Sequence, residues 1–239
     1  MNEQYNKTIA KHYSAYRPPL HQIILEHALT KTESFSVGLD IGCGTGYSAI
    51  ALTKYCSQVY GIEPSEAMLQ EATPNEKITY YWGSANSIAL SESSIDIVTF
   101  AGSLFYAKSS ELTQELIRVC RKSAIVIAYD FEILLDDILW QHGIESDKSF
   151  SYDHQINFSN DSEFTEIVSD EKQIKFTVTV SELAHLMLSS SYNHNALVEK
   201  YGSTDIFSTL VNKLNQVQKQ QYTLEANIYF SKYQIKKEG

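Results

Sequence analysis

Glycines at three alternate positions, Gly42, Gly44 and Gly46, are the part of this sequence best suited to hold a ligand. Glycine lets the chain turn sharply and lets a ligand lie against bare backbone. Asp40 lies two residues before the first glycine, and Glu63 lies 17 residues after the last. In doubly wound sheets, an acidic residue about 20 residues beyond a glycine turn accepts hydrogen bonds from ribose hydroxyls. The spacing therefore predicts a site for a nucleotide-like ligand.

Two strands and a helix are expected to position these residues. Residues 37–41 form a short apolar run typical of a buried strand, and residues 47–56 have helical spacing. Residues 59–63 predict the next strand, which ends at Glu63. An open parallel sheet binds ligands at the carboxyl ends of its strands, where helix N-termini offer free N–H groups. The acids and the glycines are thus expected at one edge of a sheet.

Residues 39–46, Leu-Asp-Ile-Gly-Cys-Gly-Thr-Gly, closely resemble motif I of class I S-adenosylmethionine (SAM)-dependent methyltransferases. Residues 61–69 resemble the second motif of the same family. The resemblance covers residues 13–130 well and the rest loosely, and the nearest set is the small-molecule methyltransferases similar to trans-aconitate methyltransferase. It implies an α/β, Rossmann-like class I methyltransferase fold, with a mainly parallel seven-stranded sheet and helices on both faces.

The resemblance also implies which residues bind the cofactor, SAM. Residues 83–90 resemble the segment that holds the adenine, although the family often has Asp where Ser84 stands. Residues 13–18 resemble an entry segment that folds over the cofactor, with Arg17 near the methionine carboxylate. The alternative for this entry is an aromatic lid packed on the sheet, with a solvated arginine. The implied SAM-binding residues are Tyr16, Arg17, Asp40, Gly42, Cys43, Gly44, Gly46, Glu63, Pro64, Met68, Ser84, Ala85, Ala101 and Gly102.

The sequence defines the methyl acceptor and the catalytic group less well. Relatives often place a His-Trp pair after the fourth strand, where this chain has Phe105 and Tyr106. No residue is therefore assigned as a general base, and a lone histidine is more often a surface or core residue than a catalyst. An acceptor that is already nucleophilic at neutral pH, a carboxylate or an amine, is favoured. The residues predicted to contact a small-molecule substrate are His12, Tyr13, Phe105, Tyr106 and Tyr192.

Strand and helix patterns alternate to about residue 129, and the pattern then changes. Strands are predicted at 78–82, 95–100, 124–128, 174–180 and 222–233. Helices are predicted at 20–29, 66–71 after a Ser65 cap, 111–119, from 181 with a Ser181 cap, 195–201 and 205–218. A short helix is expected at 131–140 and an exposed excursion at 141–162.

We expect these elements to form one methyltransferase domain over residues 1–239. An N-terminal lid at about 1–30 and a helical insertion at about 130–220 would close over the methyl group and exclude water. The last two strands would pair as an antiparallel ending to the sheet.

The composition indicates which classes of binding partner are expected. A formal net charge of −10 argues against nucleic acid, which needs a basic surface, and does not favour an anionic membrane. The polar N-terminus and the absence of a long apolar span predict a cytoplasmic protein without a signal peptide. Three cysteines without a C-x-x-C pair predict no metal site. The expected partner is a small molecule, and the expected state is a monomer or a homodimer.

Three alternatives stay open on the sequence alone. A glycine turn between a strand and a helix can bind nothing. A nicotinamide-dependent oxidoreductase is a second alternative, although its usual G-x-G-x-x-G spacing is missing because Tyr47 replaces the last glycine. A SAM-binding module without turnover is the third, because Phe105 stands where relatives have histidine.

Overall fold

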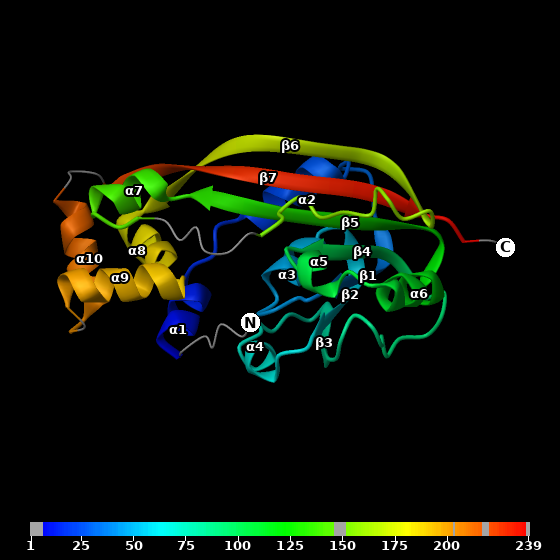
Figure 1. Ribbon diagram of the computed structural model, residues 1–239. Coiled ribbons are helices and arrows are strands. Elements are labelled where there is room, and N and C mark those ends of the chain that lie inside the picture. The colour runs from blue at the N-terminus through cyan, green and yellow to red at the C-terminus, as the bar shows by residue number, and fades with distance from the viewer. Residues whose placement is uncertain (1–6, 146–151, 203, 217–219, 238–239) are drawn as a thin grey trace. The chain divides into compact units, whose positions relative to one another are not determined.

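The structure is a computed structural model that describes residues 7–145, 152–202, 204–216 and 220–237. Its helices (Figure 1) are α1 Lys7–Ala15, α2 Leu20–Ala28, α3 Tyr47–Leu52, α4 Glu66–Gln70, α5 Leu104–Ala107, α6 Ser110–Val119, α7 Asp136–Gln141, α8 Val180–Leu188, α9 Ser191–Tyr201 and α10 Ile206–Asn215. Its strands are β1 Phe35–Ile41, β2 Cys56–Glu63, β3 Ile78–Trp82, β4 Ile95–Ala101, β5 Cys120–Leu134, β6 Phe164–Thr179 and β7 Gln221–Ile235.

The strands form one seven-stranded sheet in the order β3-β2-β1-β4-β5-β7-β6. Strand β1 pairs in parallel with β2 and β4, and the pairs β2–β3 and β4–β5 are also parallel. The chain runs along β7 against the direction of β5 and β6 (Figure 1), so one strand is antiparallel. The predicted fold, a mainly parallel Rossmann-like sheet of class I methyltransferase type, is confirmed.

Helices cover both faces of the sheet because the strand order reverses at β1. From β1 the chain moves outward through α3 to β2 and through α4 to β3, whereas from β4 it moves the other way through α6 to β5. Right-handed crossovers that run in opposite directions place their helices on opposite faces. The carboxyl ends of β1 and β4 therefore meet at the switch point, where open α/β sheets bind their ligands.

The chain divides into two compact units, which are described separately below. The sheet unit comprises residues 19–131, 152–172 and 228–239, and the helical unit comprises residues 1–18, 132–151 and 173–227. Strands β5, β6 and β7 each have residues in both units. Within the helical unit, α8 packs against α1, α9 and α10. The expected single domain, with a lid at about 1–30 and an insertion at about 130–220, stays a prediction.

Apolar side chains of the central strands and of α6 form the core of the sheet unit. Phe158 is 1% exposed, and its ring lies 5.7 Å from that of Phe100 and 4.5 Å from that of Phe164. The exposed excursion predicted for 141–162 is therefore wrong at Phe158, because burying an aromatic ring outweighs the polar character of its neighbours.

Several predicted boundaries move in the structure. The helix predicted for 47–56 ends at Leu52, because Cys56 begins β2 and pairs with Phe35 of β1. The strand predicted for 124–128 is much longer in β5, and this confines the helix predicted for 131–140 to α7. Helix α1 was not predicted at all. The strands predicted at 78–82 and 95–100 and the Ser65 cap of α4 are confirmed.

Helix α8 begins at a different cap from the one predicted. The Thr179 Oγ1 accepts a hydrogen bond from the Glu182 N–H at 3.3 Å, and a Glu182 carboxylate oxygen accepts one from the Thr179 N–H at 2.7 Å. This reciprocal pair is a capping box. The Ser181 cap is therefore wrong, because two backbone donors are satisfied when the cap lies two residues earlier, at Thr179.

Thr179→Ala is expected to lower the free energy of unfolding by about 1 kcal/mol, because the α8 N–H groups lose their acceptor. Ser181→Ala is the matched control, since Ser181 is exposed and caps nothing, and its effect should stay within about 0.5 kcal/mol. Urea unfolding followed by circular dichroism measures both. Equal losses in the two variants would contradict the assigned cap.

Candidate functional site

The glycine turn after β1 is held by the carboxyl end of the neighbouring strand β2. The Gly42 and Cys43 N–H groups both donate to the Ile62 carbonyl, at 2.7 and 3.1 Å. Gly42, Gly44 and Gly46 all have positive φ angles, of 73°, 55° and 92°. Positive φ is sterically costly for residues with a Cβ, so this path of the chain requires glycine.

Close approach of other groups adds a second reason for two of these glycines. A Cβ at Gly42 would overlap the side chain of Ser103, whose hydroxyl donates to the Ile41 carbonyl. A Cβ at Gly46 would overlap the Tyr80 hydroxyl, which donates to the Thr73 carbonyl at 3.0 Å. The sequence analysis did not find Ser103 or Tyr80, because neither belongs to a motif.

Glu63, at the end of β2, lies beside the turn as predicted. Its two carboxylate oxygens accept hydrogen bonds from the Gly44 N–H at 3.0 Å and the Ser65 N–H at 2.9 Å. Ser65 in turn caps α4, and the Met68 methyl lies against Gly44. Each carboxylate oxygen has two acceptor positions, so one position on each oxygen is not used by these two bonds. Pro64, which follows Glu63 in the chain, has no N–H to donate. Its carbonyl accepts a hydrogen bond from the indole N–H of the exposed Trp82 at 3.0 Å.

Asp40 is completely buried beneath the turn. One carboxylate oxygen accepts a hydrogen bond from the Ser48 hydroxyl at 2.5 Å, and the other accepts one from the Thr99 hydroxyl at 2.7 Å. Burial raises the pKa of Asp40 to about 6, against the opposing effect of the two hydroxyl donors. Asp40 therefore links β1 to α3 and β4 from inside the protein. Direct contact of this carboxylate with SAM stays a prediction.

The predicted adenine segment follows β3. Ser84 and Ser87 form an isolated antiparallel bridge, and Ala85 packs against the core of the sheet unit. Glu115 and Arg118 of α6 fix the segment from below: Glu115 accepts the Ile88 N–H at 2.6 Å, and Arg118 donates to the Ile88 and Leu90 carbonyls. Glu115 and Arg118 thus hold the segment through Ile88 and Leu90, and these hydrogen bonds do not involve Ser84 or Ala85.

At the carboxyl end of β4 lie the predicted residues Ala101 and Gly102. Gly102 has a φ of 71° and its N–H donates to the Tyr129 carbonyl of β5 at 2.8 Å. Its carbonyl accepts the Tyr152 hydroxyl at 2.6 Å. The end of β4 is therefore joined to β5 and to the segment that begins at residue 152.

An aromatic cluster surrounds this end of the sheet. The Phe105 ring lies 5.2 Å from that of Tyr106 and 4.5 Å from that of Tyr152. Tyr152 lies 4.6 Å from the ring of His154, whose Nδ1 is 2.9 Å from a carboxylate oxygen of Asp130. Phe105 and Tyr106 come together as predicted. The sequence analysis missed Asp130, Tyr152 and His154, because the last two lie in a polar stretch without periodicity.

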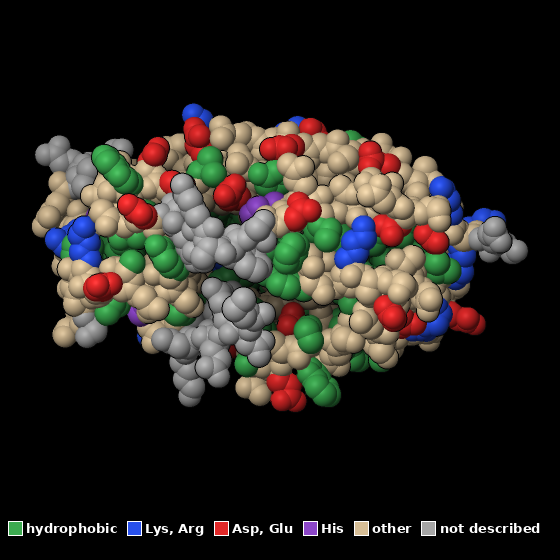
Figure 2. Space-filling model, in the orientation of Figure 1, with side chains coloured by type: hydrophobic (Ala, Val, Ile, Leu, Met, Phe, Trp, Pro, Cys, Tyr) green, Lys and Arg blue, Asp and Glu red, His purple; other side chains and the backbone are tan. Residues whose placement is uncertain are grey.

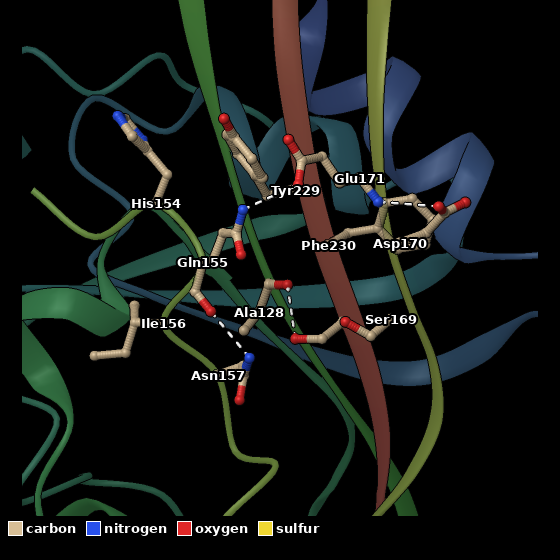
Figure 3. Close-up of a pocket in the computed structure, with 11 residues that line it drawn as sticks. Ala128, His154, Gln155, Ile156, Asn157, Ser169, Asp170, Glu171, Tyr229 and Phe230 are labelled. Carbon is tan, nitrogen blue, oxygen red and sulfur yellow. Dashed lines mark hydrogen bonds between the residues drawn. The ribbon is translucent and has the colours of Figure 1, made fainter.

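A cavity of about 400 Å³ adjoins this cluster. Figure 3 shows its wall, which is formed by the segment 154–157 together with residues of β5, β6 and β7. Gln155 crosses toward β6 and donates to Glu171 at 3.0 Å. The charged residues in the lining are Asp170 and Glu171, and no Lys or Arg belongs to it.

The other predicted residues lie in the helical unit. The Arg17 guanidinium lies 3.9 Å from the centre of the Tyr13 ring, and burial raises the pKa of Tyr16 to about 12. The His12 Nδ1 is 3.0 Å from the His185 Nδ1. Burial, followed by the charges of neighbouring histidines, lowers the pKa of His12 to about 4. Tyr192 on α9 is 41% exposed. The assigned roles of His12, Tyr13, Tyr16, Arg17 and Tyr192 stay predictions.

The structure also bears on the other expected ligands. Within the ranges that it describes, no three His, Cys, Asp or Glu side chains are arranged to hold a metal ion. The cysteines Cys43, Cys56 and Cys120 are free and buried. None of the described helices combines the length and the apolar character needed to cross a bilayer. Acidic and basic side chains are interspersed over the face drawn in Figure 2 rather than gathered by sign.

Comparison with known proteins finds similarity to methyltransferases. Residues 39–128 match the family model described as a methyltransferase domain. A Dictyostelium discoideum protein that carries the name methyltransferase is 28% identical over 131 residues, which are 53% of this chain and 49% of that protein. The chain therefore spans about half the length of this curated relative.

Solved structures share the fold at low sequence identity. A type II methyltransferase from Anaeromyxobacter dehalogenans has a TM-score of 0.60 at 16% identity, over 92% of this chain and 98% of that one. A methyltransferase structure from Bacillus halodurans has a TM-score of 0.53 at 13% identity, over 89% and 97%. A Haemonchus contortus phosphoethanolamine N-methyltransferase, in complex with S-adenosylhomocysteine, has a TM-score of 0.52 at 15% identity, over 99% and 58%.

The sheet order and the glycine turn at its switch point define a chain with the class I methyltransferase fold. Its residues 39–128 are the part that matches the methyltransferase domain family.

Gly46→Ala is expected to destabilise the protein by more than the backbone term of about 1–2 kcal/mol, because its Cβ would also displace Tyr80. Gly44→Ala is the control, since Gly44 also has a positive φ, of 55°, but an added Cβ would meet only the flexible end of Met68, at 3.2 Å. Thermal unfolding of both variants measures the difference. A Gly46→Ala variant no less stable than Gly44→Ala would disprove the close approach.

Asp40→Asn is expected to change how stability depends on pH. The folded protein holds a proton on Asp40 up to a pKa of about 6, whereas the unfolded chain releases it near 3.8. The folded state therefore binds more protons between these values, so this contribution to stability falls as the pH rises from about 4 to about 7. Unfolding titrations across this range should show the fall in the wild type and not in Asp40→Asn. Parallel pH curves for the two proteins would contradict it.

Proposed function

We propose that this chain transfers a methyl group from SAM to a small-molecule acceptor, with a carboxylate or an amine favoured. The observation that carries the proposal is the contact between the turn and the acid: the Gly44 N–H donates to Glu63 at the carboxyl edge of β1 and β2. An acid held there, with acceptor positions to spare, suits a ribose with two vicinal hydroxyls. The methyltransferase family match over residues 39–128 supports the same ligand.

The residues present fit SAM. The turn of Gly42, Gly44 and Gly46 lies at the switch point, and Glu63, hydrogen-bonded to it, would accept the ribose hydroxyls. Ser84 and Ala85 would lie beside the adenine, in the segment that Glu115 and Arg118 hold in place. When bound, SAM supplies an activated methyl group on a sulfonium. The protein's part is then to hold the acceptor in line, which can lower the barrier by about 7–11 kcal/mol.

The acceptor class rests on charge and on the aromatic cluster. The net charge of −10 gives phosphate backbones little to bind. Phe105, Tyr106 and Tyr152 instead form an apolar wall of the kind that lines small-molecule pockets. A small acceptor is therefore favoured over nucleic acid. The cytoplasmic location and the monomeric or homodimeric state expected from the sequence stay predictions.

Glu63→Gln is expected to weaken SAM binding about 10- to 100-fold, because hydrogen bonds to a charged acceptor contribute about 1.5–3 kcal/mol. Isothermal calorimetry with SAM measures the loss. Glu71→Gln, an exposed change just after α4, is the control and should leave the affinity unchanged. NADH titrated into the wild type tests the oxidoreductase alternative, and NADH binding without SAM binding would overturn the proposal.

Turnover is tested separately from binding. Purified protein and methyl-labelled SAM are incubated with small carboxylates, amines and phenols, with tRNA and total protein as controls. Labelled carboxylates or amines support the proposal. Labelled tRNA or protein, and none of the small acceptors, would contradict the acceptor class. SAM binding without transfer to any acceptor would favour a binding module.

A further inference from the structure

The aromatic cluster contains a histidine–carboxylate pair that the sequence gave no reason to assign. The His154 Nδ1 lies 2.9 Å from one oxygen of Asp130, and the other oxygen of Asp130 accepts the Phe131 N–H at 2.7 Å. The N–H of the next residue thus fixes Asp130, which also lies against Gly102, where an added Cβ would come within 3.1 Å of its carboxylate. The pair therefore lies beside the end of β4.

The carboxylate beside Nδ1 determines which nitrogen of the neutral imidazole carries the proton. A carboxylate accepts hydrogen bonds, so in the neutral ring Nδ1 carries the proton and Nε2 is the unprotonated nitrogen. If Nε2 takes up a proton, the resulting imidazolium is stabilised by the adjacent negative charge of Asp130. Neighbouring rings hold His154 in place: Tyr152 lies 4.6 Å away edge-on, and Tyr229 stacks at 5.8 Å.

The surroundings of the pair suit a cation. Phe105, Tyr106 and Tyr152 present ring faces and edges within 4.5–6.0 Å of one another, and aromatic faces attract ammonium groups. The cavity lined by His154 contains Asp170 and Glu171 and neither Lys nor Arg. Asp170 is paired with Lys172 at 3.0 Å and Glu171 accepts a hydrogen bond from Gln155, so the preference for a protonated amine rests on the aromatic rings rather than on these two acids.

We propose that the acceptor is an amine that binds as its ammonium ion against Phe105, Tyr106 and Tyr152, and that His154, oriented by Asp130, takes the proton that must leave before methyl transfer. This inference rests on the proposed methyltransferase function and narrows its acceptor class. A carboxylate acceptor would need no base, so the His154–Asp130 pair distinguishes the two acceptors that the sequence left open.

The proton and electron balance is simple. The ammonium gives one proton to His154 Nε2, which leaves a neutral amine and an imidazolium paired with Asp130. The amine lone pair then forms a C–N bond to the methyl carbon as the carbon–sulfur bond breaks, and that bonding pair stays on sulfur as a thioether. The product is a methylated ammonium, and the proton on His154 passes to solvent.

Kinetics of His154→Gln provide the main test. With amine acceptors, kcat at pH 7 should fall about 10²–10⁴-fold, the usual contribution of a general base. The loss should shrink as the pH approaches the pKa of the amine, because a neutral amine needs no base. A merely structural role would give a loss independent of pH. Calorimetry should show unchanged SAM affinity, and His27→Gln, an exposed histidine of α2, should keep wild-type kinetics.

A second measurement does not depend on turnover or on His154→Gln folding. The imidazole signal of His154 is titrated by NMR in the wild type and in Asp130→Asn, without cofactor. Loss of the negative partner should lower the titration midpoint of His154. An unchanged midpoint would overturn the assigned pairing.

The outcomes separate this inference from the function on which it rests. Amine labelling that His154→Gln abolishes at pH 7 and regains at high pH supports it. Labelling of carboxylates alone, or amine transfer that His154→Gln leaves unchanged, overturns the base and the amine acceptor while the methyltransferase function stands. A wild-type protein that binds no SAM would instead overturn the proposed function.

Discussion

The rest of the site depends on the close packing around the glycine turn at the carboxyl ends of β1, β2 and β4. Two N–H groups of the turn after β1 donate to the Ile62 carbonyl. The side chains of Ser103 and Tyr80 pack so closely against the turn that Gly42 and Gly46 have no room for a Cβ. Interiors packed to this density accept few other shapes. The turn therefore has one path, and a ligand at the switch point meets a preformed surface.

A buried carboxylate holds this arrangement together from within. The Asp40 carboxylate accepts hydrogen bonds from hydroxyl groups of α3 and β4, and it is completely buried from solvent. A buried charge is costly unless it is hydrogen-bonded, so Ser48 and Thr99 are as necessary to the site as the acid itself. Glu63 differs, because it bonds to the turn at the edge of the sheet. The two acids thus make different contacts, Asp40 with side chains of α3 and β4 and Glu63 with the backbone of the turn and of Ser65.

An aromatic cluster with a histidine–carboxylate pair lies where β4 ends beside β5. Gly102 ties β4 to β5 through the Tyr129 carbonyl and accepts the Tyr152 hydroxyl, which brings a polar segment far along the chain to the same place. The same segment places Tyr152 beside Phe105 and His154 beside Asp130.

The sequence by itself determined the fold class, the strands up to β4 and the position of Glu63 beside the glycine turn, because glycine spacing, strand-end acids and apolar periodicity are local signals. It also placed Ser65 as a cap, but not Thr179, since a capping box depends on the exact start of the helix. Only the tertiary structure decided the aromatic cluster beside the end of β4. Asp130, Tyr152 and His154 meet through contacts between strands and a segment without periodicity, and no local pattern encodes a contact between residues distant in the chain.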